Sequence, residues 1–137
     1  MESAPDAIPG VGTYTLALPP AMEKVPVTGI ASSIAEYRSP ALTLLFDFGA
    51  HRPAPPSCRG KVRCTIGSLD VHGGRASRLR YFHSDPDGGL PYRAAYEIPF
   101  APQPRRISLI VSVECASASA CDLVDRIVRT IEILPGR

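Results

Sequence analysis

Residues 107–134 read ISLIVSVECASASACDLVDRIVRTIEIL, and within this stretch the hydrophobic period changes twice. The first part alternates strictly, with Ile107, Leu109, Val111 and Val113 separated by single residues, which predicts a strand over 106–114 whose apolar side chains face inward. The next part repeats at the helical spacing, and residues 131–134 again favour a short strand. A strand, a helix and a closing strand therefore end the chain in that order.

The predicted helix has one apolar face and one polar face. Its apolar stripe is formed by Cys121, Val124, Val128 and Ile131, joined by Leu123 and Ile127. Ser117 or Ser119 is expected to cap its N-terminus, and Asp122 favours the positive end of the helix dipole. The residues expected on the solvent side are Asp125, Arg126 and Arg129.

Strand patterns dominate upstream of this helix. Residues 41–48, ALTLLFDF, place four large apolar side chains on one face, as in a core strand. Further strands are predicted over residues 13–18, 29–37, 64–72, 75–83 and 92–98. A two-residue hairpin turn at Gly73-Gly74 would set Ser68 opposite Leu79 and Ile66 opposite Tyr81.

A run of strands followed by a helix is typical of the α+β class. We predict an antiparallel sheet of about six to eight strands with the C-terminal helix packed on one face. A β-sandwich with one peripheral helix is the alternative. The 137 residues correspond to about one domain, which we place at 13–137 after a flexible lead-in at 1–12.

The four cysteines form two pairs with the same spacing. Five residues separate Cys58 from Cys64, and five separate Cys115 from Cys121. The even count and the loop-like contexts favour the two local disulfides, whereas zinc ligands normally lie closer together in sequence. Free thiols or crossed pairs stay as alternatives. Disulfides would indicate an oxidising compartment, so we expect a periplasmic or secreted protein whose leader has been removed.

Positive charge is concentrated in the middle of the chain. Between His51 and Arg80, seven of the 15 basic residues meet one of the 13 acidic residues, Asp70, although the net charge is only +2. The predicted basic surface consists of Arg52, Arg59, Lys61, Arg63, Arg75, Arg78 and Arg80. Such a stretch suits an anionic surface or a protein partner, but no aromatic residues alternate with these charges as in nucleic-acid binding.

No pattern of catalytic residues, metal ligands or cofactor binding stands out, and no apolar run of 18 residues predicts a transmembrane segment. We therefore expect a non-catalytic exported domain that binds a macromolecular or anionic partner through the basic loop between Cys58 and Cys64. One alternative is a small-molecule carrier. Its sheet–helix cleft would be lined by Tyr14, Phe46, Tyr96 and Val124. An unrecognised hydrolase is another alternative, and the oligomeric state stays open.

Several turns and strand ends resemble those of a known group of proteins. They are Leu18-Pro19-Pro20, Gly29-Ile30, Phe46-Asp47-Phe48-Gly49, Gly73-Gly74-Arg75-Ala76, the strand from Tyr92 to Pro99, and Ile131-Glu132-Ile133 after the helix. Over about residues 13–134 the chain resembles small exported bacterial proteins of uncharacterised function with a PsbP-like fold. The resemblance implies an antiparallel sheet with helices against it and, by analogy, an accessory binding role.

Overall fold

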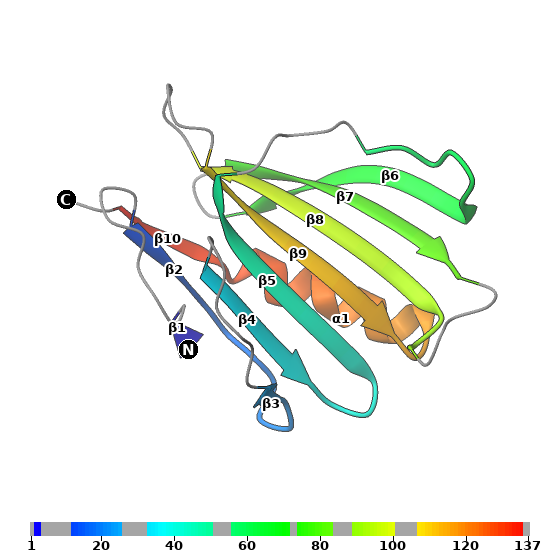
Figure 1. Ribbon diagram of the computed structural model, residues 1–137, viewed down its shortest axis with the longest axis horizontal. Coiled ribbons are helices and arrows are strands. Elements are labelled where there is room, and N and C mark those ends of the chain that lie inside the picture. The colour runs from blue at the N-terminus through cyan, green and yellow to red at the C-terminus, as the bar shows by residue number, and fades with distance from the viewer. Residues whose placement is uncertain are drawn as a thin grey trace.

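The computed structural model describes residues 2–3, 12–25, 33–50, 56–71, 74–83, 89–100 and 107–135. Two groups of strands and a single helix make up this part of the chain (Figure 1). The strands are β1 (Glu2–Ser3), β2 (Gly12–Leu16), β3 (Glu23–Val25), β4 (Ser33–Arg38), β5 (Leu42–Ala50), β6 (Val62–Val71), β7 (Gly74–Phe82), β8 (Tyr92–Phe100), β9 (Ile107–Cys115) and β10 (Glu132–Pro135). The helix is α1 (Ala118–Arg129).

The larger sheet has seven strands in the order β3-β4-β5-β9-β8-β7-β6, and every neighbouring pair is antiparallel. Strands β6 to β9 follow one another as a meander, and β9 then pairs along its full length with β5. The central strands β5, β9 and β8 are nine residues long each.

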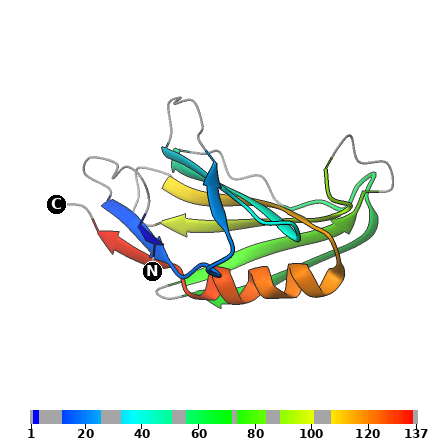
Figure 2. The same ribbon diagram turned by 90° about the horizontal axis from the view of Figure 1, so that it is seen from below.

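A second layer covers one face of this sheet. Helix α1 lies across β6, β8 and β9, and β10 leaves its C-terminal end to pair with β2 (Figure 2). The small sheet has the order β1-β2-β10 and lies on the same side as the helix, because the Tyr14 ring of β2 contacts Phe46 and Phe48 of β5. The predicted α+β class, with a helix on one face of an antiparallel sheet, is confirmed.

Glu2 and Ser3 form β1 and pair with β2. Both residues belong to the stretch predicted as a flexible lead-in, and residues 4–11 of that stretch lie outside the described part of the chain.

The core lies between the two layers and follows the alternation of the sequence. Leu42, Leu44, Phe46 and Phe48 all point into it and are at most 2% exposed. Alternate residues of β8 and β9 are also buried. They are Tyr96 and Ile98 in β8, and Leu109, Val111 and Val113 in β9. Helix α1 contributes Cys121, Val124, Ile127 and Val128. The apolar residues recur every second position in the strands and about every 3.6 positions in the helix, and these periods predict which side chains face the core.

The predicted register of the β6–β7 hairpin is wrong by two residues. Ser68 lies opposite Ser77, and Ile66 lies opposite Leu79. Gly74 already pairs with Val71, so the connection falls on residues 72–73, which are outside the described part of the chain. A shift by two keeps every side chain on the same face of the sheet, so the hydrophobic alternation does not distinguish the two registers.

Helix α1 agrees in most respects with what its sequence predicts. Ser117 is the N-cap, and its hydroxyl accepts a hydrogen bond from the Ala120 amide at 3.1 Å. Two expectations are wrong. Leu123 is exposed at 37%, and Asp125 faces the sheet instead of solvent. Asp125 faces Arg78 of β7 and Tyr96 of β8.

Candidate functional site

The seven basic residues predicted as one surface fall into separate environments. Arg52 lies outside the described residues. Arg75, at the start of β7, pairs with Asp70 of β6, with 3.6 Å between Nε and Oδ1 and both side chains largely exposed. An exposed ion pair of this kind contributes little to stability. It does place a negative charge beside one of the seven cations.

Arg78 and Arg80 point from β7 towards α1. Arg78 Nη1 lies 2.5 Å from Asp125 Oδ2, and the two side chains are only 25% and 15% exposed. Arg80 Nη1 donates to Asp122 Oδ1 at 2.8 Å, and Arg80 Nη2 donates to the Ala118 carbonyl at 3.0 Å. These two arginines therefore tie the helix to the sheet.

Asp125 has a second partner in the same place. The Tyr96 hydroxyl donates to Asp125 Oδ1 at 2.5 Å. Burial is the main reason that the pKa of Tyr96 is raised well above its ordinary value, and the hydrogen bond to Asp125 raises it further. The Asp125 carboxylate is thus held by one charged and one neutral donor from two neighbouring strands.

The remaining three cations belong to the loop closed by Cys58 and Cys64. The disulfide is formed, the Lys61 amide donates to the Cys58 carbonyl at 3.0 Å, and Gly60 adopts a positive φ of 73° that suits a residue without a side chain. Within this closed loop Arg59 is exposed and Lys61 is half-buried. The bridge and the turn hydrogen bond fix the backbone that carries both charges.

Arg63 is held differently, at a bulge where β6 begins. The register shifts between Val62 and Thr65, and Arg63 has a φ of 50°, in the left-handed region that non-glycine residues rarely adopt. Its guanidinium carbon lies 5.1 Å from the centre of the Phe82 ring, while the Lys61 ammonium lies 5.5 Å from that of Tyr81. A cation–π contact does not neutralise a charge, so neither ring supplies a counter-ion.

Among the described residues, no carboxylate lies within ion-pair distance of Arg59, Lys61 or Arg63. The basic stretch therefore separates into arginines that are neutralised within the fold and a disulfide-closed loop whose three cations are not.

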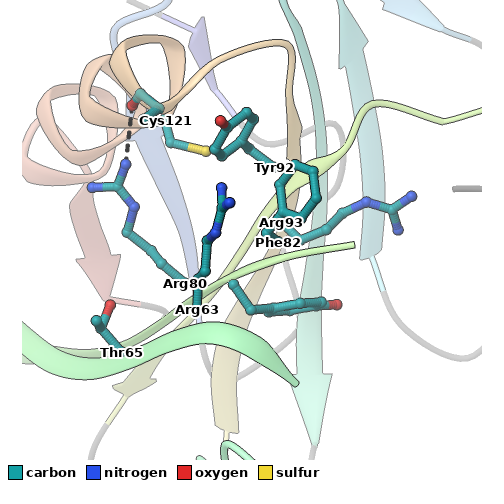
Figure 3. A pocket seen from close by; sticks show the side chains of 9 residues that line it. Arg63, Thr65, Arg80, Phe82, Tyr92, Arg93 and Cys121 are labelled. Atoms are coloured by element: carbon teal, nitrogen blue, oxygen red, sulfur yellow. Dashed lines mark hydrogen bonds between the residues drawn. The ribbon is translucent and has the colours of Figure 1, made fainter. Parts of the chain in front are cut away.

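A pocket of about 170 Å³ opens beside this loop, between the strands and the N-terminal end of α1. Its lining is formed by Arg63, Thr65, Arg80, Tyr81, Phe82, Tyr92, Arg93, Ala118 and Cys121. Figure 3 shows Arg63 and Arg80 extending from the strands towards the end of the helix that carries Cys121, whereas Arg93 points away. Phe82 and Tyr92 pack edge to face at 5.1 Å between ring centres.

The second predicted disulfide, Cys115–Cys121, is also present and joins the end of β9 to the first turns of α1. Both local pairings are therefore confirmed. Neither zinc binding by the four cysteines nor crossed pairing occurs. Within the described residues no group of His, Cys, Asp and Glu side chains is arranged to hold a metal ion.

The cleft expected for a small-molecule carrier is absent where it was predicted. Tyr14, Phe46, Tyr96 and Val124 are all at most 1% exposed and belong to one packed core. At these positions the helix and the small sheet pack directly on the large sheet, so the space between the layers is filled by side chains.

Thr65, Phe82 and Tyr92 line the pocket but were not among the site residues predicted from the sequence. The contact of Tyr92 with Phe82 depends on how β7 and β8 pair, which the hydrophobic pattern does not specify. The nearest signal in the sequence is the even spacing of Arg78, Arg80 and Phe82, which places all three on the face that meets α1.

Comparisons with protein-family models, with curated proteins and with solved structures found no match. The resemblance to exported proteins with a PsbP-like fold thus stays a prediction. In the described part of the chain, no helix is long and apolar enough to cross a membrane.

Proposed function

We propose that this protein is a non-catalytic binding domain that recognises an acidic segment of a protein partner through the Cys58–Cys64 loop. The observation that carries the proposal is the difference between the basic residues of β7 and those of the loop. Arg75, Arg78 and Arg80 each have a carboxylate partner, whereas Arg59, Lys61 and Arg63 have none among the described residues. Charges that the fold does not neutralise remain available to a partner of opposite sign.

The surroundings of the loop favour a protein over a purely ionic surface. Val62 and Ile66 of β6 are each 51% exposed, and they are two of the three large apolar residues that are exposed in the described part of the chain. Apolar side chains beside arginines are typical of protein interfaces, in which a hydrophobic centre is combined with polar contacts.

The closed loop also lowers the cost of binding. A flexible loop loses conformational freedom when a partner orders it, and this loss opposes association. The disulfide and the Lys61–Cys58 hydrogen bond order the loop before any partner arrives. Disulfides persist in oxidising compartments, so the two bridges agree with a periplasmic or secreted location for this interaction.

Capture by immobilised poly-L-glutamate tests the loop directly. The wild-type chain is expected to bind at low salt and to be released as the ionic strength rises, because salt screens exposed charges. The double variant Arg59→Glu/Lys61→Glu should lose capture at every salt concentration. A matched control, Arg126→Glu/Arg129→Glu, reverses two exposed charges on α1, far along the chain from the loop, and should retain it.

Thermal melts of both double variants show whether the fold is intact. Equal capture by the wild-type chain and the loop variant would contradict the proposal. Equal loss in the two variants would also contradict it, because capture would then reflect net charge and not the loop.

A further inference from the structure

Three arginines line the pocket beside the loop: Arg80 and Arg93 each have a carboxylate partner, whereas Arg63 has none among the described residues. Arg63 and Arg80 both extend into it (Figure 3). Arg80 is neutralised by Asp122 at 2.8 Å and also donates to the Ala118 carbonyl. Arg63 has no carboxylate partner among the described residues, and its guanidinium lies over the Phe82 ring. A singly charged anion would balance the pocket, whereas a doubly charged phosphate would exceed the charge available.

The walls of the pocket are largely aromatic. Phe82 and Tyr92 form an edge-to-face pair, and the buried Cys121 lies against the pocket from the helix side. The volume of about 170 Å³ is well below that of sites for drug-sized ligands. Such sites occupy roughly 300–1,000 Å³. The pocket therefore suits one side-chain-sized group with an apolar stem.

The backbone directs Arg63 towards this space. Arg63 adopts a left-handed conformation at a bulge, next to Cys64, whose disulfide pins the strand. Bulges change the direction of a side chain at a sheet edge, and strained backbone in non-glycine residues is concentrated at functional sites. A planar guanidinium held in this way can bind a carboxylate through two parallel hydrogen bonds.

We infer that this pocket binds a single carboxylate on an apolar stem, supplied by the acidic partner segment, with Arg63 as its ligand. The inference rests on the proposed function, because it names the group of that partner which enters the pocket. Two sources share this chemistry: a glutamate side chain and the carboxylate at a chain end.

Nuclear magnetic resonance titrations of the full chain with two matched pairs of probes test the inference. One pair is acetyl-glutamate amide and acetyl-glutamine amide, which represent a side-chain carboxylate and its neutral analogue. The other is acetyl-phenylalanine and acetyl-phenylalanine amide, which represent a terminal carboxylate and its neutral analogue. We expect saturable shifts at Arg63, Thr65 and Tyr92 with the acid of at least one pair. The pair that responds identifies the source.

Arg63→Gln should weaken acid binding about tenfold or more, because it removes a charged hydrogen bond. Arg75→Gln, which removes an exposed arginine already paired with Asp70, should leave binding unchanged. The inference is overturned if neither acid gives saturable shifts, if the neutral amides bind as well as the acids, if inorganic phosphate binds more tightly, or if Arg63→Gln has no effect.

The two proposals fail separately. Poly-glutamate capture that depends on Arg59 and Lys61, together with no acid binding at the pocket, overturns only the carboxylate pocket. Acid binding that depends on Arg63, together with no poly-glutamate capture, supports the pocket and removes the loop proposal.

Discussion

Arg78 and Arg63 carry the same charge in opposite surroundings. Arg78 is mostly buried and shares Asp125 with the Tyr96 hydroxyl, whereas Arg63 is exposed and contacts an aromatic ring. A charge that is removed from water needs a close counter-charge, and an exposed one does not. Burial at the level of single residues therefore separates structural arginines from those available for binding.

The same distinction predicts different costs for two neighbouring carboxylates. Asp125→Asn should lower the free energy of unfolding by about 2–4 kcal/mol, since it leaves Arg78 without a counter-charge in a largely dry site. Asp122→Asn should lower it by less than about 1 kcal/mol, because the Asp122 side chain is 68% exposed. Urea denaturation of both variants measures the difference. Equal losses of unfolding free energy would show that burial does not make the Arg78–Asp125 pair more important for stability than the Arg80–Asp122 pair.

At the scale of elements, the two disulfides have different roles. Cys58–Cys64 closes a surface loop, and Cys115–Cys121 joins a core strand to the helix that covers it. Both link residues six positions apart, so each restricts the unfolded chain by the same amount. Any difference between their contributions to the free energy of unfolding must then come from the folded state.

Replacing each pair of cysteines by alanine measures that difference. Cys58→Ala/Cys64→Ala should cost about 2 kcal/mol, the value expected from chain entropy for such a short loop. Cys115→Ala/Cys121→Ala should cost at least about 1 kcal/mol more, because both sulfurs are buried and their removal leaves a cavity. Denaturation midpoints and slopes of the two double variants decide the order. A larger loss in the surface pair would contradict this assignment of roles.

At the scale of the whole molecule, the packing of the two layers against each other removes one tyrosine hydroxyl of each layer from water. Tyr14 of the small sheet and Tyr96 of the large sheet are each 1% exposed. Burial is the main cause that raises the pKa of both phenols well above the ordinary value of 10.0. Folding therefore affects proton binding at sites in both layers.

This coupling predicts a loss of stability in alkali. Above about pH 10 tyrosines of the unfolded chain release their protons, while Tyr14 and Tyr96 keep theirs in the folded protein. The folded state then binds more protons than the unfolded state, so the free energy of unfolding falls as the pH rises. Each of the two tyrosines contributes a slope of about 1.4 kcal/mol per pH unit in that range.

Tyr96→Phe should remove one of these two contributions. The variant also loses the hydrogen bond to Asp125, but that loss is already present at neutral pH and does not change the alkaline slope. Urea denaturation of wild type and variant at a series of pH values measures the slopes. Identical slopes above about pH 10 would show that Tyr96 ionises in the folded protein as it does in the unfolded chain.

The hydrophobic pattern and the cysteine spacing determined much of the fold. The alternation over residues 41–48 and 106–114 predicted the core strands, the stripe from Cys121 to Ile131 predicted the helix, and the equal spacings predicted both disulfides. These features are local, because period and loop length act over a few residues and need no knowledge of distant partners.

Only the tertiary structure decided which cations are neutralised. Arg78 and Asp125 are 47 residues apart in sequence, and Arg80 and Asp122 are 42 apart. Their pairing depends on where α1 crosses the sheet and on the register of β7, neither of which hydrophobic periodicity specifies. The sequence alone therefore predicted one continuous basic surface, whereas the packing of the helix neutralises Arg78 and Arg80 and, within the described part of the chain, leaves the cations of the Cys58–Cys64 loop without a carboxylate partner.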